Sequence, residues 1–217
     1  MTDQSYDWMV IIKLDMPTST FLNLPEDKRQ RFIDLALEEF AENDYNNASI
    51  SRVVARAGIA KGSLYQYFGD KKDLYFYLLS LASQKKQEFL SEKLSTAGEQ
   101  PVFDQLDDLF AAMLNFQEQY PLFAQVGNRV LGADSPLSGE LLASARSATQ
   151  HQFSQLFEKG KSRGEIRSNA DTEAAGFIVA ALLLSIGAQP SFDLDEFKRI
   201  YRNLLLILKN GLSMPEA

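Results

Sequence analysis

Residues 49–68 predict two short helices joined by a tight turn, and no other stretch constrains the fold as strongly. Ser49 is a suitable N-cap for the first helix, because its hydroxyl can accept a hydrogen bond from a first-turn backbone N–H. Gly58 falls where a left-handed residue ends a helix without the steric penalty of a Cβ atom. Four apolar side chains at helical spacing form one face between these two residues: Ile50, Val53, Val54 and Ala57.

The second helix starts near Ala60 and packs Leu64 and Phe68, four residues apart, against the first helix. A short polar helix held by another helix across a glycine-containing turn is the helix-turn-helix arrangement that enters the major groove of DNA. The pattern therefore predicts a DNA-binding motif over residues 49–68. The face of the second helix opposite Leu64 carries hydrogen-bonding side chains: Lys61, Ser63, Tyr65, Gln66 and Tyr67.

Charge is unevenly distributed along the 217 residues, whose net charge is −7. Residues 73–217 contain 13 basic and 18 acidic residues, a charge of −5. A local basic patch can bind phosphate groups, while an acidic remainder keeps the protein soluble and limits non-specific adhesion. Residues 49–72 have a local charge of +4, because Asp70 is their only acidic residue and five are basic: Arg52, Arg56, Lys61, Lys71 and Lys72.

The same motif resembles the signature of the TetR (tetracycline-repressor-like) transcriptional regulators. The signature residues are the segment 58–68, with its glycine, Leu-Tyr pair and aromatic pair, followed by Lys71 and Leu74. The close resemblance covers residues 25–77. Upstream residues also match the first helix of the family and its exit: Arg31, Ile33, Ala36, Phe40 and Tyr45. A weaker resemblance continues at Gly164, Ile166, Arg167, Asp171 and Ala175.

The resemblance implies a homodimer whose two heads each place a second helix in one half of a roughly palindromic operator. Lys61 and Gln66 are the candidates for base edges, since lysine suits guanine and glutamine suits adenine. Gly62 lets the start of the helix approach the DNA backbone closely. Phosphate contacts, which fix register, are expected from Ser49, Ser63, Tyr65, Tyr67 and Lys71, and Arg52 completes the predicted DNA-binding set.

The rest of the chain reads as helices, about nine in all, without strand alternation or internal repeats, so we expect an all-α fold. We predict an N-terminal extension at 1–20, a DNA-binding domain at 21–72 and a ligand-binding and dimerisation domain at 73–217. Asp70 and Asp171 are expected to cap the helices that follow them. The remaining helices are predicted at 26–42, 71–95, 102–119, 122–131, 140–163 and 172–187, with a last helix that begins at Asp193 or Asp195 and ends at Asn210.

The last two predicted helices carry more apolar residues than one buried face needs. The uncharged run 174–192 is apolar on all sides, and its glycines, serines and Pro190 favour a buried packing helix over a membrane span. The resemblance implies that these helices pair with their copies in a second subunit, and the alternative is that both complete a monomeric core. The predicted interface comprises Phe177, Ile178, Ala181, Leu182, Ser185, Ile200, Leu204 and Leu208.

Aromatic residues concentrate in the C-terminal part, where the resemblance implies a small-molecule effector. Aromatic side chains at helical spacing also form ordinary hydrophobic cores, which is the alternative to a ligand site. For His151, the alternative to a ligand contact is a surface or core role. The acidic cluster Asp104, Asp107 and Asp108 is interpreted as a solvated face, with a counter-charge for a cationic effector as the alternative. The predicted ligand-binding residues are Phe110, Met113, Phe116, Tyr120, His151, Phe153 and Phe177.

Composition argues against an enzyme. The chain has no cysteine and one histidine, which excludes disulfides and thiolate catalysis and leaves little for metal or acid–base chemistry. We therefore expect no cofactor, no metal, no membrane association and a cytoplasmic location. The expected function is a repressor released from DNA by a small apolar or aromatic effector. The alternative is a helix-turn-helix protein regulated by a protein partner without such an effector.

Overall fold

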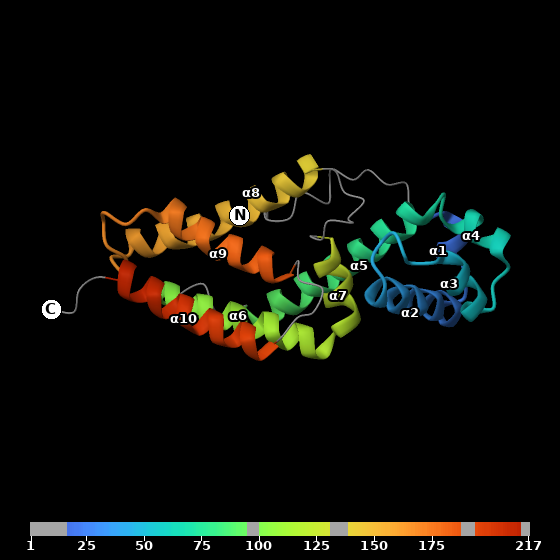
Figure 1. The fold of residues 1–217 in the computed structure, drawn as a ribbon, viewed down its shortest axis with the longest axis horizontal. Coiled ribbons are helices and arrows are strands. Elements are labelled where there is room, and N and C mark those ends of the chain that lie inside the picture. The colour runs from blue at the N-terminus through green and yellow to red at the C-terminus, as the bar shows by residue number, and fades with distance from the viewer. Residues whose placement is uncertain (1–16, 95–99, 131–138, 188–193, 214–217) are drawn as a thin grey trace. The chain divides into compact units, whose positions relative to one another are not determined.

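The computed structural model describes residues 17–94, 100–130, 139–187 and 194–213 (Figure 1). Within these ranges the chain forms ten α-helices and no named strand, which confirms the predicted all-α fold. The helix beyond the expected nine is α1, a single turn at the N-terminal end. In chain order the helices are α1 (Ser19–Leu22), α2 (Glu26–Glu42), α3 (Ile50–Ala57), α4 (Lys61–Tyr67), α5 (Lys71–Lys93), α6 (Val102–Gln119), α7 (Pro121–Arg129), α8 (Gly139–Ser162), α9 (Thr172–Gly187) and α10 (Leu194–Leu212).

The described residues divide into two compact units (Figure 1). The head unit contains residues 17–88 and 116–130, and the body unit contains residues 89–94, 100–115, 139–187 and 194–213. Helices α1–α4 and α7 therefore belong to the head unit, while α8–α10 belong to the body unit. The domain boundaries expected after residues 20 and 72 remain a prediction.

Local sequence signals explain where several helices begin and end. The Asp70 carboxylate accepts a hydrogen bond from the Asp73 backbone N–H at 2.9 Å, and Asp171 accepts one from Ala174 at the same distance. Both side chains therefore cap the helices that follow them, as predicted. Gly58 ends α3 in the left-handed conformation, with φ 68°. An L-residue with a Cβ atom is strained in this conformation, so glycine is favoured there.

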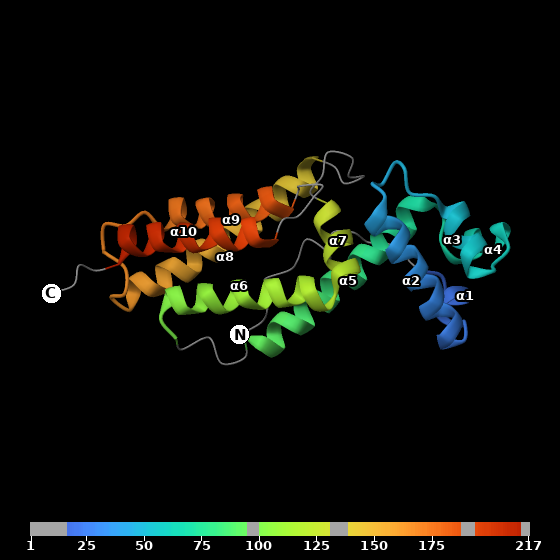
Figure 2. The same ribbon diagram turned by 60° about the horizontal axis from the view of Figure 1, so that its bottom comes forward.

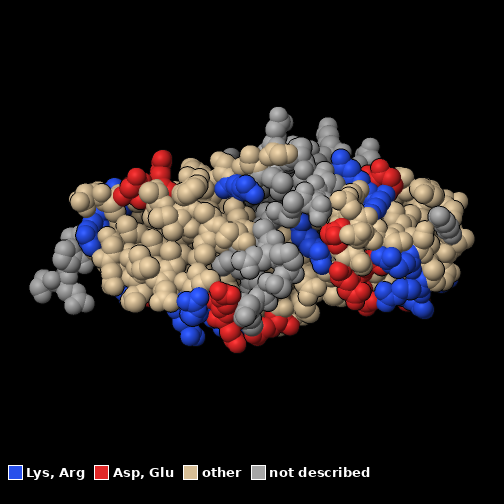
Figure 3. Space-filling model, viewed as in Figure 1, with Lys and Arg blue, Asp and Glu red and all other residues tan. Residues whose placement is uncertain are grey.

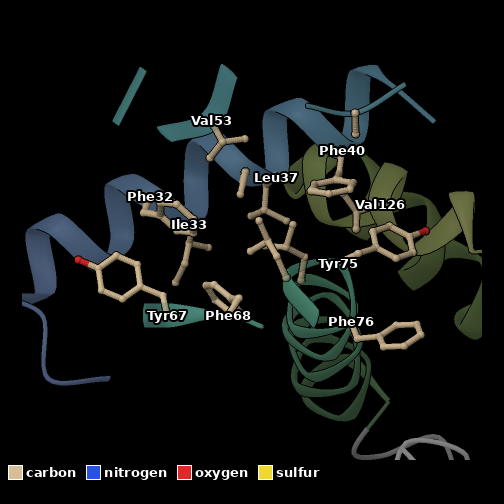
Figure 4. Close-up of a cluster of buried hydrophobic side chains, with 14 of the residues drawn as sticks. Phe32, Ile33, Leu37, Phe40, Val53, Tyr67, Phe68, Tyr75, Phe76 and Val126 are labelled. Atoms are coloured by element: carbon tan, nitrogen blue, oxygen red, sulfur yellow. The ribbon is translucent and has the colours of Figure 1, made fainter. Parts of the chain in front are cut away.

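The head unit is built around aromatic side chains of α2 that pack against α4 and α5 (Figure 4). The Phe32 ring stacks on the Phe68 ring with centroids 6.0 Å apart, and Phe40 lies 5.2 Å from Tyr75. Helix α7 joins this core through the fully buried Val126. Arg129 of α7 also donates a hydrogen bond from Nε to the carbonyl of Ala41 at 2.9 Å. The end of α2 is thus held by α7, while α3 packs against α2 as well.

The body unit depends on close packing of α8 against α9, which run side by side (Figure 2). A Cβ atom at Gly176 would lie 2.6 Å from the Ser154 backbone nitrogen and 2.9 Å from the Gln150 carbonyl oxygen. Only glycine therefore permits this approach of the two backbones. Arg167 donates hydrogen bonds from Nε to Ser213 O and from its guanidinium to Asn210 O, both at 2.8 Å. It thereby satisfies carbonyls at the end of α10.

The apolar run 174–192 is α9 as far as Gly187, and residues 188–192 lie outside the described residues. No helix in the described parts of the chain is long and apolar enough to cross a membrane.

Candidate nucleic-acid interface

Helices α3 and α4 form the predicted helix-turn-helix pair. The Ser49 hydroxyl accepts a hydrogen bond from the Arg52 backbone N–H at 3.4 Å and so caps α3. Val53 and Val54 of α3 and Leu64 of α4 are buried in the head core, and Phe68 directly after α4 is fully buried. These contacts leave the opposite face of α4 outward, as the spacing of apolar residues predicts.

The outward face of α4 contains most of the predicted contact residues. Tyr65 is 62% exposed, Gln66 is exposed and Ser63 is half-buried. Gly62 is exposed, and a Cβ atom there would meet nothing within 4 Å, so another molecule can approach the start of α4 closely. Lys61 begins the helix, but its side chain lies outside what the structure describes.

Tyr67 corrects the prediction that its side chain lies on the outer face of α4. The residue is only 9% exposed, and its ring packs 5.6 Å from Phe21 and 6.5 Å from Phe32 between ring centroids. Figure 4 shows the hydroxyl oxygen pointing away from the labelled cluster. The ring therefore contributes to the core because α1, which the sequence analysis did not predict, covers this side of α4. A phosphate contact by the hydroxyl stays a prediction.

Arg52, a predicted DNA contact, is bound within the protein by Glu39 of α2. Arg52 Nε donates to the two Glu39 carboxylate oxygens at 3.1 and 3.0 Å, and Arg52 also donates to the Asn47 carbonyl at 3.0 Å. The same carboxylate accepts a 2.7 Å hydrogen bond from the Ser49 backbone N–H. Glu39 is only 4% exposed, and the hydrogen bond from Arg52 lowers the pKa of its carboxyl, with the Ser49 N–H acting in the same direction. Glu39 thus links the end of α2 to the start of α3.

The basic patch is also partly neutralised by α2. Arg56 donates a hydrogen bond to the Glu38 carboxylate at 2.5 Å, so two of the five basic residues between positions 49 and 72 have acidic partners upstream of that stretch. Figure 3 accordingly shows acidic and basic side chains next to one another over the visible face of the head unit. The local charge of +4 therefore overstates the charge that is free to attract phosphate.

Lys71 has two contacts inside the head unit. Its Nζ donates a hydrogen bond to the Asn46 carbonyl at 3.1 Å and lies 4.8 Å from the centroid of the Tyr45 ring. Burial lowers the pKa of the Lys71 ammonium. The side chain thus braces the loop between α2 and α3, and its predicted phosphate contact would have to share the ammonium with Asn46.

Two residues missed by the sequence analysis support the motif. Glu39 is a charged residue beside the apolar stripe of α2, and its partner Arg52 lies 13 positions away, so local periodicity gave no signal for the pair. Thr18 contacts the end of α4, 48 positions away, although the sequence analysis assigned it to an extension. A signal for α1 did exist, because threonine before a short apolar segment is a common N-cap.

Part of the predicted dimer surface is exposed and apolar in the single chain, and its role as an interface stays a prediction. On α9, Phe177 is 57% exposed and Ile178 is 45% exposed, beside the exposed Ala181 and Ser185 and the half-buried Leu182. On α10, Ile200 and Leu204 are half-buried, but Leu208 is only 6% exposed and packs in the body core. The exposed apolar residues of α10 are instead Leu206 and Ile207, at 58% and 68%.

The predicted ligand-binding residues do not form one cluster. Phe110 is buried against Tyr201 and Phe197, whereas Phe153 belongs to a second buried cluster with Phe157 and Val179. Met113 is half-buried. Phe116 is buried in the head unit and lies 5.5 Å from the half-buried Tyr120 between ring centroids.

Two of the predicted ligand-binding residues are exposed in the single chain, and their role in ligand binding stays a prediction. Phe177 points outward on α9, and His151 is exposed on α8, where a ring nitrogen lies 2.9 Å from the Gln155 amide nitrogen. The three aspartates of α6 are exposed, which confirms their interpretation as a solvated face. Asp104 and Asp107 line a shallow groove of about 250 Å³ with Arg202 and Lys209, in which the opposite charges compensate one another. Among the described residues no group of three His, Cys, Asp or Glu side chains could hold a metal ion.

A capped α3, a left-handed glycine and an outward polar face on α4 together define a protein of the helix-turn-helix class. Residues 32–78 match the family described as "Bacterial regulatory proteins, tetR family". A solved TetR family transcriptional regulator from Chloroflexus aurantiacus J-10-fl is 36% identical, and the match covers 92% of this chain and 99% of that one with a TM-score of 0.75. The chain therefore belongs to the TetR family of transcriptional regulators, a family of regulators and not of enzymes.

Other relatives resemble the chain over less of its length or at lower identity. The fatty acid metabolism regulator protein of Bacillus subtilis (strain 168) is 38% identical over 63 residues, which is 29% of this chain and 31% of that regulator. The structure of the FadR regulator from Bacillus subtilis, determined with stearoyl-CoA, shares the fold at 21% identity and a TM-score of 0.61, over 84% of this chain and 98% of that one.

Proposed function

We propose that the protein is a homodimeric repressor that binds a roughly palindromic DNA operator and is released from it by a small apolar or aromatic effector. The observation that carries the proposal is the outward face of α4, which carries Gly62, Ser63, Tyr65 and Gln66. The opposite side of this helix packs into the head core through Leu64. Such a helix fits the major groove, and the two heads of a dimer reach half-sites about one helical turn, roughly 34 Å, apart. Operator binding would place the protein in the cytoplasm.

The DNA contacts divide into two kinds. Gln66 is the exposed side chain best suited to a base edge, because its amide can pair with the donor and acceptor of adenine, and Lys61 is proposed to read guanine at the start of α4. Ser63 and Tyr65 are proposed to bind phosphates, and the bare backbone at Gly62 lets the DNA come close. Lys71 is proposed to add one further phosphate contact at the start of α5.

The homodimer is proposed to form through α9 and α10. Phe177 and Ile178 on α9 and Leu206 and Ile207 on α10 expose large apolar side chains on the single chain. Burial of apolar area is the main source of free energy in association, and a patch of this kind commonly marks a binding site. A two-fold axis would place the same four residues of a second copy against this apolar patch.

The effector is proposed to bind in the body unit near the buried aromatic cluster around Phe110. The FadR structure shows that a protein of this fold can hold a molecule with a long apolar chain. By linkage, an effector that favours a conformation with badly spaced heads must weaken DNA binding by the factor by which DNA weakens effector binding. A coupling of about 1–3 kcal/mol changes affinity by roughly 5- to 150-fold.

The DNA part of the proposal is tested by selecting duplexes from a random pool with the wild-type protein. Binding of a selected duplex should weaken steeply with salt, and Gln66→Ala should lose preference at one base pair of each half-site, by about 1–3 kcal/mol. Gln84→Ala, on an exposed position of α5, is the matched control and should leave the preference intact. Failure of the wild-type protein to enrich any duplex would contradict the proposal.

The effector part has its own test. A panel of apolar, aromatic and acyl-chain compounds is screened for an increase in thermal stability and for release of a labelled selected duplex. Compounds that do both support a ligand-released repressor. If none does, while a bacterial protein releases the duplex, the alternative regulation by a protein partner is correct.

A further inference from the structure

The recognition helix α4 needs support from outside because it is short. It contains seven residues, and its N-cap Ala60 supplies no side-chain hydrogen bond. Isolated helices of this length are unstable in water, and the last carbonyls of any helix lack partners within it. The orientation of α4 therefore depends on the groups that contact its two ends and its buried face.

Thr18, just before α1, binds two carbonyls at the end of α4. Its hydroxyl donates a hydrogen bond to the Gln66 carbonyl at 2.6 Å, and its backbone N–H donates one to the Tyr67 carbonyl at 3.1 Å. The same hydroxyl oxygen accepts a 3.4 Å hydrogen bond from the Phe21 backbone N–H, which caps α1. One residue thus joins the start of α1 to the end of the recognition helix.

Phe21 fixes the position of Thr18. Its side chain is fully buried, with ring centroids 4.9 Å from Phe68, 5.6 Å from Tyr67 and 5.7 Å from Tyr77. Because α1 is a single turn, this anchor lies only three residues from Thr18. Movement of Thr18 away from α4 would have to pull Phe21 out of the core, so the two hydrogen bonds are held in place by packing.

We propose that Thr18 is a positioning residue for base reading, and that its hydroxyl sets the orientation of the last turn of α4. The inference rests on the proposed DNA-binding function. The last turn carries Gln66, and the hydroxyl binds the backbone carbonyl of that same residue. A shift of this carbonyl moves the Gln66 Cα atom and with it the amide that is proposed to meet a base. Thr18 itself need not touch DNA.

The decisive comparison is between Thr18→Val and Thr18→Ser. Valine keeps the shape of threonine and the backbone N–H but removes the hydroxyl, whereas serine keeps the hydroxyl. The measured quantity is the ratio of dissociation constants for a scrambled duplex and for a duplex selected by the wild-type protein. We expect Thr18→Val to lower this ratio about 3- to 10-fold, as the loss of the hydroxyl's hydrogen bond to the Gln66 carbonyl implies, and Thr18→Ser to restore it. The salt dependence of binding should stay unchanged, because no phosphate contact is removed.

Amide hydrogen exchange in the free protein supplies a readout that does not need DNA. The amides of residues 64–68 should exchange faster in Thr18→Val than in the wild-type protein and in Thr18→Ser, while amides of α2 should not change. If the wild-type protein selects no duplex, the proposed DNA-binding function fails, and the exchange rates alone decide whether Thr18 positions α4.

Three results would overturn the inference. Wild-type exchange rates at residues 64–68 in Thr18→Val would show that the hydroxyl does not hold the helix. Equal losses in Thr18→Val and Thr18→Ser would show that the hydroxyl is not the responsible group. Equal weakening of the selected and the scrambled duplex would show a general effect on binding without a role in base reading.

Discussion

At the scale of single residues, the head unit uses charged side chains to hold its own elements. Arg52 donates to Glu39 and to the Asn47 carbonyl, and Lys71 donates to the Asn46 carbonyl. The Arg52 side chain is still 53% exposed, so exposure alone would place it among the DNA contacts. Its hydrogen bonds indicate instead that it orders the start of α3.

The salt dependence of DNA binding separates these two roles. Arg52→Gln should weaken binding of a selected duplex without changing the slope of log affinity against log salt. Lys71→Gln, assayed alongside, should reduce the magnitude of the slope by about 0.9, as loss of one phosphate contact requires. A slope change of that size in Arg52→Gln would show that Arg52 contacts phosphate in the complex.

The Glu39 carboxyl gives a pH dependence with a defined sign. The hydrogen bond from Arg52 lowers its pKa in the folded protein below the ordinary value of 4.5, so the unfolded chain takes up this proton at higher pH than the folded one. The stabilisation is therefore present above about pH 4.5 and is lost as the pH falls through the folded-state pKa. Glu39→Gln should lower the free energy of unfolding at pH 7 and should lose less of it between pH 7 and pH 3, measured by urea denaturation. An equal acid-induced loss in both proteins would contradict the assignment.

At the scale of elements, the two units use glycine in different ways. Gly58 allows the left-handed end of α3, and Gly176 allows α9 to approach α8. Gly127 of α7 has no such requirement, because a Cβ atom there would meet nothing within 4 Å. The change in stability caused by an added methyl group therefore differs between helical glycines. Its sign depends on whether a neighbouring helix lies within contact distance.

Gly176→Ala should destabilise the protein by about 1–3 kcal/mol, because the added methyl group would overlap the α8 backbone at Ser154. Gly127→Ala is the matched control and should be neutral or stabilising by up to about 1 kcal/mol, since alanine favours helix more than glycine does. Denaturant unfolding of both variants measures the difference. Similar stabilities would show that α8 and α9 can separate at low cost.

At the scale of the whole molecule, the apolar surface of α9 and α10 bears on the oligomeric state. Ile207 is 68% exposed in the single chain, so a charged substitution there should leave the fold intact. In a dimer built through α10 the same charge would be buried in the interface at considerable cost. A charged substitution at this position therefore distinguishes a dimer formed through α10 from a monomer in which α9 and α10 only complete the core.

Ile207→Glu should give folded monomers in sedimentation experiments at micromolar concentration and should lose binding to a two-half-site duplex. Asn115→Glu introduces the same charge at an exposed position of α6 and should remain dimeric. Helix content from circular dichroism verifies that both variants are folded. A wild-type protein that sediments as a monomer would contradict the homodimer.

The sequence by itself determined the features that depend on neighbours within one or two turns. The stripe on α3, the Ser49 and Asp70 caps and the glycine at position 58 specify helix ends through local hydrogen bonds and backbone sterics, and the structure confirms them. The resemblance to TetR regulators depends on the same short-range pattern and is confirmed by a relative that covers nearly the whole chain.

Only the tertiary structure decided which of several possible faces or partners each residue uses. Helix α10 is apolar at 204–208, so periodicity alone did not indicate that Leu208 enters the core while Ile207 faces outward. Arg52 contacts Glu39 because α3 packs against α2, and Thr18 contacts Gln66 because α1 packs against α4. Helical spacing determines which side chains of a helix lie on the same face. Which of those faces is buried depends on contacts with other helices.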